Sequence, residues 1–265
     1  MIAMSNDAIR DELRNSVWRV MEERGIARFP RPVFGRIPNF VGAEEAAMRL
    51  VNDDLFKKAQ VVKVNPDSPQ RSVREAVLRS GKILIMPTPR ISKGFLLLDP
   101  KRIPPTLYSV ASTISGAFRY GKYVEPEEIP EVDLVVAGST VVSIYGERLG
   151  KGEGYSELEY GILIEYSKLS PEVPIVTTVH DVQVVNQHIP LKPWDFTVDY
   201  MYTPTKVLKS LGMRVRPKGI LWEYLSEEKL REIPLLQKLK LRRKCRPYRT
   251  LPQTPYTRHY RRDRL

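Results

Sequence analysis

Short apolar runs alternate with helix-length segments along the middle of the chain, and this alternation limits the possible folds more than any other feature. Five β-rich runs lie at 60–64, 82–87, 133–138, 174–180 and 198–203, and residues 219–225 form a candidate sixth. Helical patterns lie between or beside them at 70–80, 106–117, 155–168 and 204–211. Short buried strands joined by amphipathic helices predict a layered α/β domain with a mostly parallel sheet.

Residues 1–59 are predicted to form a lead-in of helices and a proline-rich loop ahead of this sheet. Residues 7–24 have helical periodicity, with Asp7 as the expected N-cap. The expected core-facing stripe is Ile9, Leu13, Val17, Val20 and Met21. Arg10 and Arg14 lie off this stripe, one turn apart, where a solvated helix face is the ordinary interpretation.

Most of the positive charge is concentrated at the C-terminal end. Residues 242–265 contain nine Lys or Arg and one Asp, a local charge of +8 within a total of +12. We therefore expect residues 1–241 to form the α/β domain and residues 242–265 to form a basic arm. Tyrosines among these cations suit RNA or another polyanion, and the alternatives are packing on a neighbouring subunit or disorder.

The composition also excludes several classes of protein. No apolar run approaches the about 20 residues of a membrane span, and the N-terminus has no apolar signal core. Cys245 is the one cysteine, which excludes an intrachain disulfide and a Cys-built metal cage. A cytoplasmic protein is expected, and the oligomeric state stays open.

The stretch GERLGKGEGYSELEYGIL, residues 146–163, is the strongest local indication of a ligand site. It has four glycines within nine residues, with Arg148 and Lys151 among them, ahead of a helical pattern. Bare backbone and the N–H groups of a helix N-terminus attract phosphate, and ligands of α/β sheets collect at the carboxyl ends of the strands. A tight turn alone needs fewer glycines, and no GK[ST] sequence marks a Walker A loop. The stretch therefore predicts an anion site of another type.

GERLGKGEGYSE resembles the G-x-R-L-G-x-G-x-G-Y-Y-D signature of the 5-formyltetrahydrofolate cyclo-ligases, also called methenyltetrahydrofolate synthetases. The likeness is closer to the branch of methenyltetrahydrofolate synthetase domain-containing proteins. It extends over roughly residues 7–235. The similar blocks are FPRPVFGRIPNF, KVNPDSP, PTPR, GKGEGYSELEY, TVHDVQVV and VDYMYTPT.

The resemblance implies a Rossmann-like three-layer α/β/α domain that binds ATP and Mg²⁺. Members of the family transfer the γ-phosphoryl group to the N5-formyl oxygen, and N10 then closes the ring of 5,10-methenyltetrahydrofolate. An amide oxygen is a poor leaving group, and its phosphorylation corrects this, so the protein supplies positioning and charge stabilisation. The expected function is an ATP-dependent cyclo-ligase acting on 5-formyltetrahydrofolate or a related pterin.

Carried onto this chain, the signature places the nucleotide at the glycine stretch. The implied nucleotide contacts are Arg10, Arg14, Arg148, Leu149, Gly150, Lys151, Gly152, Glu153, Gly154 and Tyr155. Arg148 and Lys151 are the implied catalytic cations. Glu157 replaces the terminal Asp of the signature, and Asp199 matches a second acid of the family, so both are expected to bind Mg²⁺ at one edge of the sheet.

The departures from the family pattern fall on the side that binds the pterin. Ser156 stands in place of the second Tyr of the signature, which removes a ring from the site. The expected substrate contacts are Asp67, His180, Gln183 and Trp194. For His180, a structural hydrogen bond is the alternative to a substrate contact.

Two other functions stay open at this stage. One is a non-catalytic, nucleotide-regulated RNA-binding protein on the same scaffold, with residues 242–265 as the contact. The other is an ATP-dependent kinase or ligase acting on another small acid.

Overall fold

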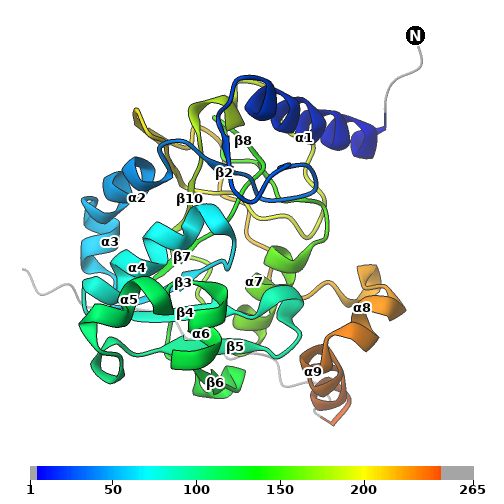
Figure 1. The fold of residues 1–265 in the computed structure, drawn as a ribbon. Helices are drawn as coiled ribbons and strands as arrows, with labels where there is room; N and C mark the ends of the chain where they lie inside the picture. Colours follow the sequence, from blue (N-terminus) through cyan, green and yellow to red (C-terminus); the bar gives the residue numbers. More distant parts are fainter. Residues whose placement is uncertain (1–4, 246–265) are drawn as a thin grey trace, which may run out of the picture.

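A computed structural model describes residues 5–245, and its centre is a twisted sheet of eight strands (Figure 1). Across the sheet the order is β13-β12-β10-β7-β3-β4-β5-β6. In chain order these strands are β3 (Val61–Val64), β4 (Ile83–Pro87), β5 (Phe95–Leu98), β6 (Lys122–Val124), β7 (Leu134–Val136), β10 (Ile175–Thr178), β12 (Tyr200–Tyr202) and β13 (Val207–Lys209). The five strands from β12 to β4 run parallel, and antiparallel strands flank them. The predicted, mostly parallel α/β sheet is confirmed.

Helices cover both faces of the sheet, and each face has its own apolar core. One face carries α2 (Ala43–Val51), α3 (Asp54–Lys58), α4 (Arg71–Arg79), α5 (Tyr108–Ala111) and α6 (Ile114–Tyr120), and the other carries α7 (Tyr155–Glu165), α8 (Glu227–Glu232) and α9 (Pro234–Cys245). Because side chains alternate between faces along a strand, Val62 and Val64 of β3 join the first core while Val61 joins the second. Lys63 therefore points toward α7.

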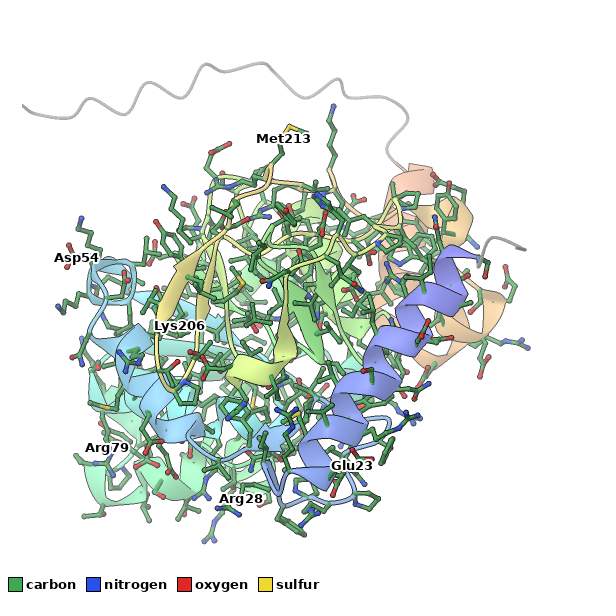
Figure 2. All side chains as sticks on the ribbon, turned by 90° about the horizontal axis from the view of Figure 1, so that it is seen from above. Glu23, Arg28, Asp54, Arg79, Lys206 and Met213 are labelled. Atoms are coloured by element: carbon green, nitrogen blue, oxygen red, sulfur yellow. The ribbon has the colours of Figure 1, made fainter. Side chains whose placement is uncertain are left out.

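A smaller unit with a third core packs beside the loops that follow the central strands. It contains α1 (Asn6–Glu23), the pair β1 (Ala27–Arg28) and β2 (Asn39–Phe40), and a sheet of β8 (Val141–Ser143), β9 (Arg148–Leu149) and β11 (Val184–Val185). Seen from above, α1 lies across one side of the molecule with Glu23 at its end (Figure 2). This unit brings the N-terminus of the chain to the glycine stretch.

The α1 helix is placed as predicted, but its cap and its buried face differ. Ser5, and not Asp7, is the N-cap, and its hydroxyl accepts from the backbone N–H of Ala8. The buried face contains Arg10, Arg14, Val17, Trp18 and Met21. The two arginines are buried because the first half of α1 packs over polar loops instead of an apolar core. A solvated face is therefore the wrong interpretation of their spacing.

Two other segments also differ from their sequence patterns. Residues 204–211 form an extended edge that contains β13, where a helix was predicted, because β13 pairs with β12. Residues 219–225 contain a short 3₁₀ turn at Trp222–Tyr224, where a strand was the candidate. The other 3₁₀ turns lie at Ser68–Gln70, Pro89–Ile91, Pro100–Arg102, Pro105–Leu107, Pro126–Glu128 and Asp181–Gln183.

The C-terminal end of the described chain is helical. The α9 helix begins at Pro234 and extends to Cys245, into the segment predicted to be a basic arm. The rest of that arm, and with it most of the predicted polyanion contact, lies outside the described residues. Within residues 5–245, no helix has both the length and the apolar character that crossing a membrane requires.

Candidate functional site

The glycine loop, defined as residues 150–154, connects β9 to the N-terminus of α7. Gly152 and Gly154 have φ angles of 108° and 75°, a region that side chains of other residues rarely adopt. Gly154 is the N-cap of α7, and no side chain caps this helix end. The first turn of α7 therefore presents its backbone N–H groups in the way that phosphate sites require.

Two buried arginines of α1 hold this helix against the glycine loop. Arg14 Nε donates to the carbonyl oxygen of Gly150 at 2.8 Å, and Arg14 Nη1 donates to Asp11 Oδ1 at 2.6 Å. Arg10 Nη1 and Asp195 Oδ2 form a buried ion pair at 2.5 Å. The structure thus brings Arg10 and Arg14 to the predicted nucleotide side of the loop, although each already has an ion-pair partner.

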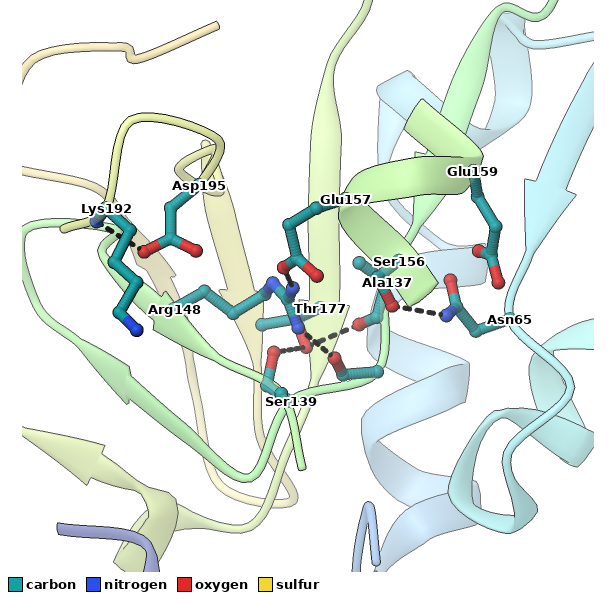
Figure 3. Close-up of polar contacts among 12 residues, drawn as sticks. Asn65, Ala137, Ser139, Arg148, Ser156, Glu157, Glu159, Thr177, Lys192 and Asp195 are labelled. Atoms are coloured by element: carbon teal, nitrogen blue, oxygen red, sulfur yellow. Dashed lines mark hydrogen bonds and ion pairs between the residues drawn. The ribbon is translucent and has the colours of Figure 1, made fainter. Parts of the chain in front are cut away.

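Arg148 lies beneath the glycine loop and not on its ligand side. Its side chain is 0% exposed, donates to the carbonyl oxygen of Gly138 at 2.7 Å, and pairs with the Glu157 carboxylate (Figure 3). Its guanidinium carbon also lies 4.8 Å from the ring centre of Phe196. Because β9 is buried on both faces, Arg148 and Leu149 cannot make the side-chain contacts with nucleotide that were predicted. Arg148 instead positions Glu157.

Asp199 lies at the opposite edge of the sheet from Glu157. It directly precedes β12, at the amino end of the strand, and Oδ2 accepts from the backbone N–H of Ile175 at 2.8 Å. Arg214 and Arg216 pair with the same carboxylate at 2.9 and 2.7 Å. The prediction that Asp199 and Glu157 share a metal site is therefore wrong. In the described part of the chain, no group of three or more His, Cys, Asp or Glu is arranged to hold a metal ion.

Replacing Asp199 by Asn is therefore expected to leave the ATP affinity within about twofold, because distant sites act independently. The free energy of unfolding should fall by about 1–3 kcal/mol, since two arginines lose their charged acceptor. The segment that carries them lies at the surface, where Met213 projects outward (Figure 2). Calorimetry with ATP and urea denaturation measure the two effects. A loss of ATP affinity without a loss of stability would show that Asp199 belongs to the nucleotide site after all.

Two cavities meet at the glycine loop. The larger, of about 550 Å³, lies between the loop, the proline-rich segment 30–37 and the turns that follow β3 and β4. The smaller, of about 240 Å³, lies between the loop and α1 and is closed by residues 192–195. The residues that line both cavities are Gly150, Gly154 and Glu157. The loop and the start of α7 therefore form the boundary between the two.

The larger cavity has an apolar wall and a polar floor. Its apolar lining is Pro30, Phe34, Ile37, Pro66, Pro89 and Ile114. Its floor contains Asn65, Asp67, Ser156 and Glu159. Phe34 is 48% exposed and packs against Trp18, with 6.1 Å between the ring centres. Among these residues, the sequence had indicated only Asp67 as a substrate contact.

A chain of polar groups crosses this floor. Lys63 Nζ lies 2.5 Å from Glu159 Oε2 and donates to Asn65 Oδ1 at 2.8 Å, and Asn65 Nδ2 donates to Ser156 Oγ at 2.9 Å. Burial raises the pKa of the Glu159 carboxyl, against the pull of Lys63. One sequence signal could have found this network: Lys63 interrupts an apolar run, and a buried Lys needs an acidic partner.

Lys151 is the cation of the glycine loop that faces the larger cavity. Its ammonium group pairs with Glu153 at 2.6 Å, and its side chain is about one third exposed. It also lies close enough to Asp67 to oppose the effect of burial, which raises the pKa of that carboxyl. Lys151 and Asp67 therefore both face the larger cavity.

The rim of the larger cavity is joined to α8. The Tyr155 hydroxyl donates to Glu232 at 2.9 Å, and Lys229 Nζ lies 3.3 Å from the centre of the Tyr155 ring. Arg90, which has a φ of 57°, pairs with Glu232 at 3.6 Å and with Glu153 at 4.0 Å. The turn after β4 and α8 thus meet over the end of the glycine loop.

His180 and Gln183 do not line either cavity. His180 Nδ1 accepts from the backbone of Val182, and Gln183 is buried and donates to the carbonyl oxygens of Ser139 and Thr140. These bonds join two loops at the sheet edge, as the structural alternative for His180 expects, and the structure does not bring either residue to the cavity that Asp67 lines. Trp194 lines the smaller cavity, whereas Asp67 lines the larger one.

The chain is similar in sequence to known proteins over most of its length. A sequence model of the 5-formyltetrahydrofolate cyclo-ligase family matches residues 3–204. The methenyltetrahydrofolate synthase domain-containing proteins of Bos taurus and Homo sapiens are 42% and 40% identical over 236 and 238 residues, or 87% and 88% of this chain. The chain spans 62% of the length of each.

Two solved structures are also similar. The 5,10-methenyltetrahydrofolate synthetase of Aquifex aeolicus aligns with a TM-score of 0.48 and 19% identity, over 84% of this chain and all of that one. The corresponding synthetase of Mycoplasma pneumoniae aligns with a TM-score of 0.44 and 12% identity, over 76% and 99% of the two chains.

Proposed function

Because the chain belongs to the 5-formyltetrahydrofolate cyclo-ligase family, we propose that it is an ATP-dependent cyclo-ligase acting on 5-formyltetrahydrofolate or a related reduced pterin. The observation that carries this proposal is that two cavities meet at the glycine loop, whose backbone is of the type that binds phosphate. Transfer of a phosphoryl group requires two substrates held end to end in a fixed geometry. We assign ATP to the smaller cavity and the pterin to the larger.

The smaller cavity suits the charged part of a nucleotide. Arg14 and Lys192 line it together with Gly152 and the indole of Trp194. Cations and the N–H groups at the start of α7 complement phosphate oxygens. Lys192 pairs with Asp7 at 2.5 Å across the mouth of this cavity, so ligand phosphates would compete for its charge.

Magnesium is the metal that the family implies, and the acidic groups present fit an ion carried by the nucleotide. Mg²⁺ is often held by one or two carboxylates together with substrate phosphates. Glu157 is the carboxylate that lines both cavities, and Arg148 fixes its orientation from below. When bound there, the ion would neutralise charge on the phosphates.

The reaction assigned to the site has two steps, a phosphoryl transfer and a ring closure. The formyl oxygen forms a bond to the γ-phosphorus and the bond from that phosphorus to ADP breaks. N10 then attacks the formyl carbon, loses its proton, and inorganic phosphate leaves with the original formyl oxygen. Lys151, which faces the larger cavity from the loop, stabilises the negative charge on the transferring group.

The test of this proposal is the absorbance of the methenyl product. The full chain, mixed with 5-formyltetrahydrofolate, ATP and Mg²⁺, should give rising absorbance at the methenyl chromophore, with one phosphate released per product. Omission of ATP is the control. A flat trace, with ATP binding intact by calorimetry, would reject the folate assignment.

Phe34 supplies an aromatic surface to the larger cavity, so we expect its replacement by Ala to raise the KM for 5-formyltetrahydrofolate by about tenfold, because a stacked heterocycle gains roughly 1–3 kcal/mol from such a ring. The Kd for ATP should not change. Phe29 is 84% exposed on the same loop and does not line the cavity, so Phe29→Ala is the matched control. Equal KM values for the two variants would contradict the stacking role.

A further inference from the structure

The direction of each hydrogen bond in the floor network follows from its first donor. Lys63 carries donors only, so the Asn65 atom that faces it must be the carbonyl oxygen Oδ1. Asn65 therefore presents its NH₂ group to Ser156 Oγ, which accepts at 2.9 Å. Lys63 and Glu159 are 3% and 4% exposed, so water does not offer an easy alternative to this order.

This order of donors determines where the hydroxyl hydrogen of Ser156 can point. A serine hydroxyl has one hydrogen to donate, and the lone pair that faces Asn65 is already used as an acceptor. Among residues 5–245, the Ser156 side chain makes this one hydrogen bond to the protein, in which its oxygen accepts. Ser156 and Asn65 both line the larger cavity, and Figure 3 shows the hydrogen bond between them. The remaining donor of the network is therefore directed into the space assigned to the substrate.

We propose that Ser156 is a specificity-determining residue whose hydroxyl, oriented by Lys63 through Asn65, donates a hydrogen bond to a carbonyl oxygen of the substrate. This proposal rests on the proposed function and deepens it. The family signature has a Tyr at this position, so a directed polar contact replaces a ring, while Phe34 in the lining of the same cavity supplies aromatic surface. The ligand chemistry that fits is a planar heterocycle that carries an oxo or formyl oxygen.

The first experiment measures the affinity of the full chain for 5-formyltetrahydrofolate by calorimetry. Ser156→Ala should bind about tenfold more weakly, as expected for the loss of one hydrogen bond, and Ser156→Thr, which keeps a hydroxyl, should bind within about twofold of the wild type. The Kd for ATP should stay constant in both. Ser80→Ala is the matched control, because Ser80 is exposed at the far end of α4.

The second experiment tests the relay. Asn65→Asp replaces the NH₂ donor that faces Ser156 by a carboxylate oxygen, which is an acceptor. The Ser156 hydroxyl therefore donates to the new carboxylate and turns its lone pairs toward the substrate. This variant should also lose about tenfold in affinity although Ser156 is present, and the double variant Asn65→Asp/Ser156→Ala should lose no more than the single ones. Additive losses would overturn the relay. Ser156→Ala keeps the donor itself testable if Asn65→Asp does not fold.

The binding of tetrahydrofolate, which lacks the formyl group, shows whether Ser156 donates to an oxygen of the ring or to the formyl oxygen. Equal weakening of both ligands by Ser156→Ala would assign the acceptor to the ring, and weakening of the formyl compound alone would assign it to the formyl group. Unchanged affinity of Ser156→Ala for both, with a wild type that binds, would overturn this inference alone. A wild type that binds neither ligand would overturn the proposed function and this ligand assignment together.

Discussion

Replacing Lys151 by Ala is expected to lower kcat for methenyl formation by about 100-fold, with little change in thermal stability. Lys151 faces the larger cavity from the glycine loop, and it forms an ion pair with Glu153, whose side chain is 37% exposed. A charge that meets the substrate oxygen mainly as the phosphoryl group arrives stabilises the transition state more than the bound reactants. The Kd for ATP should therefore change much less than kcat.

Two further variants make this result specific. Lys101 is exposed in a 3₁₀ turn away from both cavities, so Lys101→Ala removes the same charge without touching the site. Arg148→Ala should instead lower the melting temperature markedly, because it leaves Glu157 without its buried partner. Steady-state kinetics and thermal melts distinguish the three. A kcat of Lys151→Ala within about threefold of the wild type would remove Lys151 from the chemistry.

The largest effect on stability is expected for Lys63→Met. Lys63 and Glu159 form a buried ion pair, and removal of one partner leaves a buried charge without compensation, at a cost of about 3–5 kcal/mol. Lys63→Met/Glu159→Leu, which removes both charges, should recover most of this loss. Urea denaturation measures both, and a single variant as stable as the wild type would contradict the importance of the pair.

The stability of Lys63→Met should also depend on pH in a defined direction. Burial already raises the pKa of Glu159 in the folded protein, and the loss of Lys63 removes the largest opposing effect. A carboxyl whose pKa is higher in the folded state destabilises the fold when it is ionised, and the penalty disappears as it is protonated. The deficit relative to the wild type should therefore shrink as the pH falls from neutral toward the ordinary pKa of Glu.

Much of the site could be predicted from local sequence, because its main part is local. The glycine loop and the start of α7 are contiguous, and glycines ahead of a helix allow the left-handed backbone that this loop adopts. Arg10 and Arg14 were placed at this loop by resemblance alone. Their burial could not be predicted, since it depends on where α1 packs, and no local pattern encodes that.

The site predictions that differ from the structure share one cause: a short stretch of sequence does not show at which edge or face of the sheet a residue lies. Asp199 lies next to a strand-like run, as metal-binding residues often do. It precedes the strand, however, and so lies at the amino edge of the sheet. Arg148 was assigned to the ligand by its neighbours in sequence, yet both residues of β9 are covered on both sides. His180 and Gln183 follow a strand at the correct edge but bond to each other's backbone and to neighbouring loops.

What the sequence by itself determined is the set of periodic strands and helices, the family and the bare backbone of the loop, since each depends on neighbours in the chain. What only the tertiary structure decided is the substrate half of the site. Phe34, the pair Lys63 and Asn65, and Glu159 come from three separate segments, and they meet because β3 directs Lys63 toward α7 while the proline-rich segment lines the same cavity. Contacts of this kind depend on which faces the packed layers bring together, and that information is absent from any single stretch of residues.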